Sequence, residues 1–165
     1  VGTLMSNLGL EVAFKKLSIP FKRANVGDRY VMQLLKENNW SIGGEGSGHV
    51  INLEHIPTGD GVVSGIQVLA AMVETGMSLS ELKSGMEKYP QKLINVRYAD
   101  DKAPLEVAEV KQAIADAEQE LGEEGRILIR KSGTEPLIRV MTEGKDSELI
   151  ISIAEKVAEK VREFS

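Results

Sequence analysis

Apolar residues in positions 1–89 form short clusters that alternate with stretches of helical spacing. A short cluster bounded by polar or turn residues predicts a strand, whereas apolar positions three and four apart predict a helix. Strands and helices that alternate in this way favour a layered α/β domain with a mixed, largely parallel sheet. The strands are expected within residues 1–5, 20–26, 40–42 and 50–53.

Four helices are expected in this part of the chain, and each begins at a polar residue that can cap it. The caps are Asn7, Asp28, Asp60 and Ser78, the last in a capping box with Glu81. The first helix covers residues 8–17, the third ends at Gly76, and the fourth runs through Leu82 to Met86. In the first helix Leu10, Phe14 and Leu17 share a face, and in the second the apolar residues Val31, Leu34 and Leu35 follow the cap. In the third we expect the apolar side chains to point inward: Val62, Ile66, Leu69 and Val73.

The pattern changes at Tyr89-Pro90-Gln91, where proline stops the preceding helix. The sequence therefore predicts one domain over residues 1–89 and a second over residues 90–165. The second domain has the order strand, helix, strand, strand, helix, which favours a small α+β domain whose helices cover one face of a sheet. Its strands are expected at residues 93–98, 126–130 and 137–142, and its helices at residues 103–121 and 148–164.

Composition narrows the classes of function. The 165 residues carry 20 Lys and Arg against 25 Asp and Glu, a net charge of −5 without a basic tract, which argues against nucleic-acid binding. No apolar run approaches the roughly 18 residues needed to cross a bilayer, so no membrane association is expected. The absence of cysteine excludes disulfides and thiolate chemistry, and two histidines leave little scope for a histidine-rich metal centre.

The chain begins at Val1 without an initiator methionine and without a charged segment ahead of an apolar one. No secretory signal is therefore expected, and we predict a cytoplasmic protein. Because this apolar start resembles the inside of a strand, we also expect the chain to be part of a longer polypeptide.

The segment that joins the last two expected strands carries the strongest local signal. It offers two hydroxyls, a glycine that lets backbone N–H groups turn toward one point, and flanking guanidinium groups, which together suit a phosphate. The same residue types also allow a tight turn whose hydroxyls bond their own backbone, with the arginines paired to Glu135 or Glu143. The candidate phosphate ligands are Arg130, Ser132, Gly133, Thr134 and Arg139.

A second candidate segment, residues 43–49, holds four glycines in seven residues. It offers the side chains of Glu45, Ser47 and His49, all of which can hydrogen-bond a polyol. It is not a P-loop, because His49 and Val50 replace the Lys-Ser/Thr pair, and it lacks the third glycine of the dinucleotide fingerprint. A wide hairpin turn would also account for it. The alternation of a carboxylate, a hydroxyl and an imidazole nevertheless favours recognition of a hydroxyl-rich ligand.

Three weaker features have simple structural interpretations. Asp28 and Arg29 fit a helix cap and its exposed neighbour, although α/β domains place ligands at such strand-to-helix loops. The single carboxylate of Asp60 makes a poor metal site, and helix capping explains it better. His55 has no acidic or histidine partner at ligand spacing. No metal site is expected in this chain.

Taken together, these segments resemble the bacterial phosphoglucosamine mutases, within the α-D-phosphohexomutase superfamily. The resemblance covers essentially the whole chain and implies the C-terminal part of a four-domain enzyme. The chain would hold most of a three-layer α/β third domain, truncated at its N-terminus, and the whole of the fourth domain. The matching segments, in order, are residues 5–11, 26–31, 43–49, 58–61 and 130–139.

The resemblance implies that the parent enzyme interconverts glucosamine 6-phosphate and glucosamine 1-phosphate, a step in peptidoglycan precursor synthesis. Glu45 and Ser47, with His49 beside them, match the family's sugar-recognition loop. Asp28 and Arg29 match a loop that faces the active site. The five candidate phosphate ligands match the loop that grips the substrate phosphate. The family usually has a bulkier residue where Gly46 stands.

The resemblance also implies what these residues do not supply. The family transfers phosphate from a phosphoserine in its first domain, uses Mg²⁺ held by an aspartate-rich loop in its second, and is activated by a sugar 1,6-bisphosphate. Neither segment occurs in the 165 residues. The chain is therefore expected to bind phosphosugar, to be inactive alone, and to need the N-terminal domains of the same polypeptide. A phosphomannomutase/phosphoglucomutase fragment and a free-standing phosphosugar-binding module are the alternatives.

Overall fold

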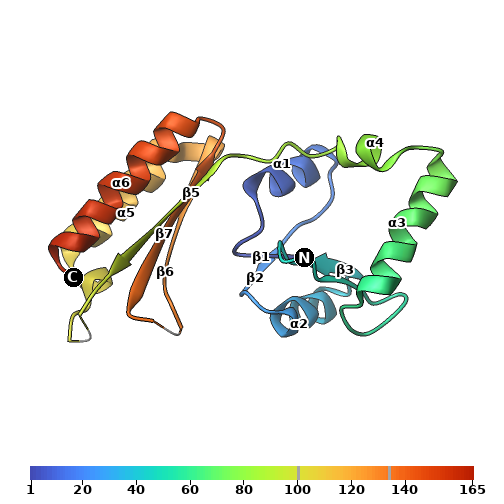
Figure 1. The fold of residues 1–165 in the computed structure, drawn as a ribbon, viewed down its shortest axis with the longest axis horizontal. Coiled ribbons are helices and arrows are strands. Elements are labelled where there is room, and N and C mark those ends of the chain that lie inside the picture. Colours follow the sequence, from blue (N-terminus) through green and yellow to red (C-terminus); the bar gives the residue numbers. More distant parts are fainter. Residues whose placement is uncertain (100, 134) are drawn as a thin grey trace. The chain divides into compact units, whose positions relative to one another are not determined.

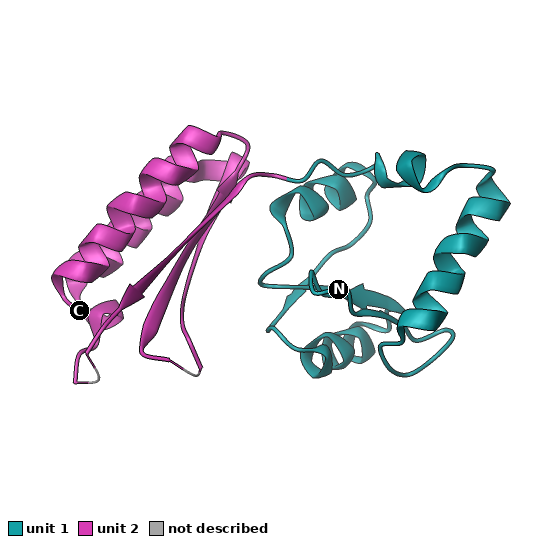
Figure 2. Ribbon diagram, viewed as in Figure 1, with its two compact units in different colours: residues 1–88 teal, residues 89–165 magenta. Residues whose placement is uncertain are grey.

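The computed structural model describes residues 1–99, 101–133 and 135–165. The chain forms two compact units, Val1–Lys88 and Tyr89–Ser165, called unit 1 and unit 2 below (Figure 2). Each unit has helices and strands of its own, so each is described by itself.

The strands of unit 1 are short and follow one another across a mixed sheet. β1 (Gly2–Thr3) pairs in parallel with β2 (Arg23–Ala24), and β3 (Ile42–Gly44) pairs antiparallel with β4 (Val50–Asn52). The amino group of Val1 donates to the Ile42 carbonyl at 2.9 Å, and the Gly44 N–H donates to the Val1 carbonyl at 3.0 Å. This is the hydrogen-bond pattern of neighbouring parallel strands, so the order is β2–β1–β3–β4. The predicted mixed α/β fold is confirmed.

One face of these strands is covered by α2 (Asp28–Asn38), which lies on the other side of the strands from α1 (Figure 1). The distance between this helix and β3 depends on Gly43, because a Cβ at that position would lie 2.7 Å from Cγ1 of Val31. Gly43 therefore lets helix and strand approach closely. The core between them consists of Ala24, Val31, Leu35 and Ile51.

The opposite face carries α1 (Leu8–Lys16). Asn7 caps this helix as predicted, because its Oδ1 accepts the N–H of Gly9 at 3.0 Å. Phe14 of α1 and Val50 of β4 line the same cavity. Neighbouring residues of a strand point to opposite faces, so Val50 lies on the face opposite to Ile51 and α2.

The third and fourth helices, α3 (Gly61–Thr75) and α4 (Leu79–Lys83), begin where the sequence predicts. The Oδ1 of Asp60 accepts the N–H groups of both Val62 and Val63 at 2.9 Å. The capping box between Ser78 and Glu81 is present. One predicted cap is wrong, since Asp28 is the first residue of α2 and its N-cap is Gly27, whose φ of 128° favours glycine.

The prediction that the apolar stripe of α3 points inward is also wrong for this chain. Its four side chains are largely exposed, and no residue of α3 is buried. The helix contacts chiefly β4 and α4, so little of the described chain packs against the stripe. Periodicity identifies an apolar face but not what covers it. The exposed fractions are 73% for Val62, 60% for Ile66, 60% for Leu69 and 83% for Val73.

Other predicted elements of unit 1 are shorter than expected. A strand extends only as far as its paired neighbour, so β1 and β2 each comprise two residues. Leu17 is exposed at the end of α1, and α4 stops at Lys83 instead of reaching Met86. The strand predicted at residues 40–42 begins only at Ile42. Pairing partners, which determine these lengths, are not visible in local sequence patterns.

Unit 2 contains an antiparallel sheet in the order β5–β7–β6. Its central strand, β7, has eight residues, of which seven pair with β5 and seven pair with β6. The two strands predicted at residues 126–130 and 137–142 are confirmed, and each is slightly longer than expected. The bounds are β5 (Gln91–Arg97), β6 (Gly125–Lys131) and β7 (Leu137–Gly144).

Two helices, α5 (Ala108–Leu121) and α6 (Ser147–Glu163), cover one face of this sheet, as predicted (Figure 1). The expected helix over residues 103–121 is interrupted, because Pro104–Glu106 forms a 3-10 turn and Val107 is extended. No helix in the described ranges is both long and apolar enough to cross a membrane. The buried core of unit 2 comprises Val96, Val110, Ala117, Leu121, Ile138, Val140, Ile150, Ile153, Val157, Ala158 and Val161.

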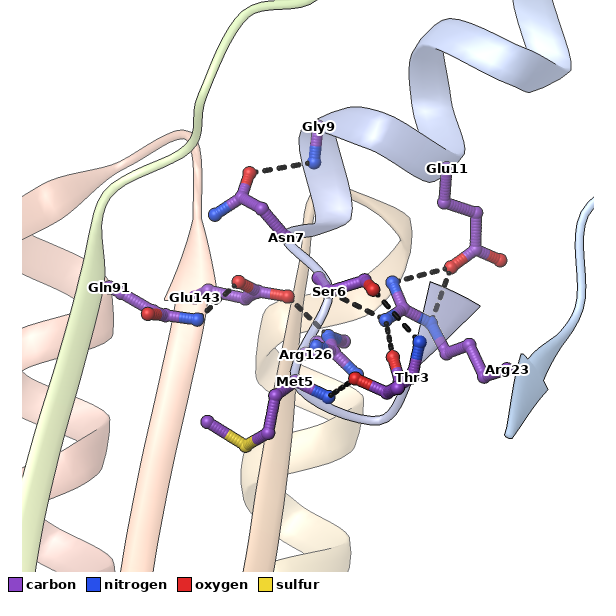
Figure 3. Close-up of polar contacts among 10 residues, drawn as sticks. All are labelled: Thr3, Met5, Ser6, Asn7, Gly9, Glu11, Arg23, Gln91, Arg126 and Glu143. Atoms are coloured by element: carbon purple, nitrogen blue, oxygen red, sulfur yellow. Dashed lines mark hydrogen bonds and ion pairs between the residues drawn. The ribbon is translucent and has the colours of Figure 1, made fainter. Parts of the chain in front are cut away.

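The sheet face opposite the helices carries a row of polar residues near its end. Gln91, Glu143 and Arg126 are direct partners on the three strands. Glu143 is fully buried, accepts the Nε2–H of Gln91 at 2.8 Å, and forms an ion pair with Arg126 (Figure 3). A buried carboxylate requires such partners, because an uncompensated buried charge is strongly destabilising.

Candidate functional site

The loops that follow β1, β2 and β3 lie at one edge of the strands of unit 1. These strands run in the same direction, so their carboxyl ends meet at that edge. The loops comprise residues 4–7, 25–27 and 45–49. In α/β folds ligands bind at this edge of the sheet. The three loops therefore form the candidate site of unit 1.

Residues 45–49 form a hairpin turn between β3 and β4. The N–H of Glu45 donates to the His49 carbonyl at 2.9 Å, and the N–H of Gly48 donates to the Glu45 carbonyl at 3.1 Å. The side chains gather within the turn, since Oγ of Ser47 lies 3.2 Å from Nδ1 of His49 and 3.5 Å from Oε2 of Glu45. The glycine-rich segment is thus a hairpin turn that also brings together the three predicted sugar-binding side chains.

Asp28 joins this cluster from a different loop. One ligand atom each of Asp28, Glu45 and His49 lie within 4.8 Å of one another. Oε1 of Glu45 also accepts the N–H of Gly27 at 2.6 Å, which ties the hairpin to the first turn of α2. The cluster therefore combines two loops that are separate in sequence.

Arg29 is next to Asp28 in sequence, but its guanidinium is held by Tyr30. Its Nη2 donates to the Tyr30 hydroxyl at 3.0 Å, and Cζ lies 4.6 Å from the centre of that ring. In the described part of the chain no cation forms an ion pair with Asp28 or Glu45. Of the two residues predicted to face the active site, only Asp28 lies against the hairpin turn of residues 45–49.

The cluster of Asp28, Glu45 and His49 offers two carboxylates and an imidazole, a donor set that a divalent cation could accept. Mg²⁺, however, prefers oxygen ligands in an octahedral arrangement. One oxygen of Glu45 is already bonded to the Gly27 N–H. Hydroxyl groups of a polyol can donate to the remaining acceptor atoms without displacing that bond. The cluster fits a polyol better than it fits Mg²⁺.

A partly buried arginine holds the loop after β1. Arg23 donates to the carbonyls of Thr3 at 3.0 Å and Ser6 at 2.6 Å, and its Nε donates to Oε2 of Glu11 at 2.9 Å (Figure 3). Oγ of Ser6 in turn accepts the N–H of Thr3 at 2.9 Å. The loop backbone is thereby fixed from two sides. Sequence analysis missed Arg23, because an arginine in an expected strand carries no local signal.

A cavity of about 420 Å³ lies between α1 and the strands of unit 1. Its wall is mainly apolar and includes Phe14 and Val50. Ser6, Asn7 and Glu45 also line it. The loop held by Arg23 and the hairpin turn of residues 45–49 therefore border one concave space.

Unit 2 presents two arginines side by side. Arg130 of β6 and Arg139 of β7 are direct cross-strand partners, so their side chains leave the same face of the sheet. Like charges in this position are destabilising. Among the described residues no carboxylate forms an ion pair with either arginine. The arrangement suits an anion that lies between the two guanidinium groups.

The turn beside these arginines adds further polar groups. Nη2 of Arg139 donates to Oγ of Ser132 at 3.4 Å. The structure therefore brings Arg130, Ser132 and Arg139 into one neighbourhood, with Gly133 exposed in the same turn. Thr134, the remaining predicted phosphate ligand, lies outside the described residues.

The alternative in which nearby acids neutralise these arginines is not what the structure shows. Glu143 is bonded to Arg126 and Gln91, in a row distant along the strands from Arg139. Glu135 forms no ion pair with any other described residue. Neither arginine of the pair is therefore neutralised by a carboxylate of the described residues.

Comparison with protein families identifies both units. Residues 1–89 match the family model described as phosphoglucomutase/phosphomannomutase, alpha/beta/alpha domain III. Residues 93–160 match the model for the C-terminal domain of the same family. Between them the two matches leave only the connection and the last few residues uncovered.

Individual relatives agree with the family matches. The phosphoglucosamine mutase of Pseudoalteromonas atlantica is 58% identical over 162 residues, which is 98% of this chain and 36% of that protein. Among solved structures, Aspergillus fumigatus N-acetylphosphoglucosamine mutase in complex with GlcNAc-6P and magnesium has a TM-score of 0.73 and 19% identity, and covers 98% of this chain and 40% of that chain. A variant of that enzyme in complex with glucose 1,6-bisphosphate gives 0.75 and 19%, over 98% and 38%. At this identity the structures establish the fold, and this chain spans only about two fifths of such proteins.

Proposed function

Because the chain belongs to the phosphoglucomutase/phosphomannomutase family, we propose that it is the substrate-binding C-terminal part of a phosphoglucosamine mutase. The parent enzyme would interconvert glucosamine 6-phosphate and glucosamine 1-phosphate. In this proposal, residues 1–89 are part of its third domain and residues 90–165 are its C-terminal domain. The identity of 58% to a phosphoglucosamine mutase favours this branch over the phosphomannomutases.

The two units divide the ligand by the polarity of their groups. Unit 1 offers acceptors at Glu45, Ser47 and His49, with Asp28 beside them, and these suit neutral sugar hydroxyls. Unit 2 offers guanidinium donors, which suit a phosphate dianion. A carboxylate at position 45 would repel phosphate, so the two ends of the substrate are not interchangeable between the units.

The observation that carries the proposal is the direct pairing of Arg130 with Arg139, with no carboxylate to neutralise them among the described residues. Their forked donors can neutralise and orient a phosphate group that is not being transferred. Ser132 lies beside them in the same turn, where its Oγ accepts a hydrogen bond from Arg139. This chain thereby holds and orients the substrate.

Groups outside these residues complete the reaction. Mg²⁺, when bound, neutralises charge on the transferred phosphoryl group. The acceptor cluster of unit 1 fits this ion poorly, as argued above, so we assign the ion to the N-terminal domains of the same polypeptide. The donor phosphoserine, which the family resemblance implies, is assigned to those domains as well. A sugar 1,6-bisphosphate as activator and a cytoplasmic location belong to the same proposal.

Turnover assays of two polypeptides test the proposal. The full-length protein that contains residues 1–165, supplied with Mg²⁺ and glucosamine 1,6-bisphosphate, should convert glucosamine 6-phosphate at least tenfold faster than mannose 6-phosphate. The 165-residue chain alone should show no turnover above background, although it should bind phosphosugar.

Two results would contradict this assignment. Faster turnover of mannose 6-phosphate or glucose 6-phosphate by the full-length protein would place it in the phosphomannomutase/phosphoglucomutase branch. Sustained turnover by the 165-residue chain would show that the donor and metal sites are not elsewhere. A gene that encodes only this chain would favour a free-standing binding module.

A further inference from the structure

The candidate site of unit 1 carries more negative charge than the recognition of neutral hydroxyls requires. Asp28 and Glu45 each bring a carboxylate, and one oxygen of each lies within 4.8 Å of the other and of a ring nitrogen of His49. Within the described ranges none of the three side chains takes part in an ion pair. Like charges at this separation repel each other. The cluster is net negative whether or not His49 is protonated, so a cationic group of a ligand would balance it.

The two carboxylates differ in their hydrogen bonds. Oε1 of Glu45 accepts the N–H of Gly27 at 2.6 Å, and Oε2 lies 3.5 Å from Oγ of Ser47. The half-buried carboxylate of Asp28 accepts no hydrogen bond from any residue that the structure describes. A position in the first turn of α2 stabilises negative charge, which accounts for an acidic residue there but not for its approach to Glu45. Asp28 is thus the carboxylate with both oxygens available to a ligand.

The space beside Asp28 is kept open by a glycine from a third segment. Gly59 forms an isolated bridge with Ile51 of β4, which brings the segment before α3 to the cluster. A Cβ on Gly59 would lie 3.7 Å from Oδ2 of Asp28 and 3.7 Å from Cδ2 of His49. Any longer side chain at this position would therefore compete with a ligand for the space beside both residues. Because position 59 is glycine, Asp28 stays accessible from that side.

We propose that Asp28 binds the amino group of the substrate and makes unit 1 select amino sugars over neutral hexoses. A primary amine is a cation at neutral pH, so it forms a charge-assisted hydrogen bond with a carboxylate, whereas a hydroxyl at the same position donates without a charge of its own. Glu45 and Ser47 then bind neighbouring hydroxyls, and Asp28 adds the contact that depends on the charge of the ligand. The inference rests on the proposed function, because it takes a phosphosugar as the ligand of this site.

Calorimetric titration of the full-length protein isolates this contact. Asp28→Asn keeps the size of the side chain and an acceptor oxygen but removes the charge, and Asp28→Glu keeps the charge. The ligands are glucosamine phosphate and glucose phosphate, which differ only in the amine or hydroxyl at C2. Each is used as the 1-phosphate and as the 6-phosphate, because the amine lies at a different distance from the phosphate in the two isomers. A chelator removes Mg²⁺, so that the bound ligand is not turned over.

The matched control is Glu54→Gln, which removes an exposed carboxylate from the segment between β4 and α3. In the unaltered protein we expect at least one glucosamine phosphate to bind about tenfold more tightly than the corresponding glucose phosphate. Asp28→Asn should lose this preference through weaker binding of the glucosamine phosphate, with both glucose phosphates bound within a factor of about two of the unaltered protein. Asp28→Glu should retain a preference, and Glu54→Gln should change none of the affinities.

Several outcomes would overturn the inference, and they separate it from the proposed function. A preference for glucosamine phosphate that persists in Asp28→Asn would overturn the inference alone. Equal losses for all four sugar phosphates would show that Asp28 maintains the structure of the site, which would also leave the proposed function in place. The same loss of preference in Glu54→Gln would assign it to the general charge of unit 1. An unaltered protein that binds glucose phosphate as tightly as glucosamine phosphate would contradict both the inference and the assignment of the substrate.

Discussion

Arg130 and Arg139 oppose each other across two strands, and this arrangement determines what their substitution should do. A charge-assisted hydrogen bond contributes about 1.5–3 kcal/mol. Arg130→Ala in the full-length protein should therefore weaken binding of phosphosugar and of inorganic phosphate alike, by roughly ten- to a hundredfold. Isothermal calorimetry measures both affinities. Arg162→Ala, an exposed arginine on α6, is the control and should change neither. Undiminished phosphate binding by Arg130→Ala would contradict the assignment.

Glu45 should behave differently, because its carboxylate accepts hydrogen bonds and repels phosphate. The amide of Glu45→Gln can still accept the N–H of Gly27, so the local backbone is retained. We expect phosphosugar affinity to fall about tenfold and phosphate affinity to stay within a factor of about two. The same calorimetric titrations decide this. An equal loss for both ligands would show that Glu45 does not distinguish sugar from phosphate.

The site was only partly visible in the sequence at this scale. Residues within one loop, such as Glu45 and Ser47, could be grouped because they are neighbours in sequence. The approach of Asp28 to His49 depends on how two strands pair, and no local pattern records that. For the same reason the sequence left open whether Glu143 pairs with Arg139, whereas strand register assigns it to Arg126.

At the scale of elements, Arg23 connects β2 to the loop after β1. Arg23→Gln removes the donors to the carbonyls of Thr3 and Ser6, and unsatisfied buried groups cost about 1–3 kcal/mol. We expect a loss of stability in that range and faster amide hydrogen exchange in residues 4–7. Glu11→Gln is the matched control, since it leaves both carbonyl bonds in place. If exchange in this loop rises equally in the two variants, Arg23 does not hold it.

The capping box of α4 gives this helix a dependence on pH. The hydrogen bonds from the side chain and then from the backbone of Ser78 lower the pKa of Glu81 below its ordinary value. A lowered pKa in the folded state means that the cap contributes fully above the unfolded-state pKa and is lost as pH falls through the folded-state pKa. The first turn of α4 should therefore fray in acid. NMR titration should show the pKa of Glu81 rising toward its ordinary value in Ser78→Ala, and an unchanged pKa would contradict this origin of the shift.

The residues at which helices begin could be predicted more reliably than the burial of their side chains. Asp60 and Ser78 cap their helices through contacts within a few residues, and local sequence is sufficient for that. The burial of Ile66 depends on elements far away in the chain or outside it, so its position in an apolar stripe could not determine its exposure. The break in the helix at Val107 was not predicted, because apolar residues continue at helical spacing from residue 103 onward.

At the scale of the whole molecule, the two units differ in the size of their buried apolar cores. Among the described residues, five apolar residues of unit 1 are buried against fourteen of unit 2. Unit 2 should therefore unfold at the higher temperature, and residues 89–165 alone should fold with a midpoint within a few degrees of that in the longer chain. Circular dichroism of both polypeptides, with hydrogen exchange to assign the transitions, measures this. A single transition shared by both units, or an unfolded 89–165 polypeptide, would contradict it.

The row formed by Gln91, Glu143 and Arg126 has a consequence for how this sheet assembles. A shift of β7 by one residue against β6 is disfavoured, because every side chain of the shifted strand would move to the other face of the sheet. A shift by two residues keeps each side chain on its own face, so the alternation alone does not disfavour it. Such a slip would set Glu143 opposite Leu128 or Glu124 on β6 instead of Arg126. The carboxylate would then be buried without a cation, at a cost of about 3–5 kcal/mol. The single carboxylate of Glu143 thus makes the sheet that is misaligned by two residues less stable than the correctly paired one.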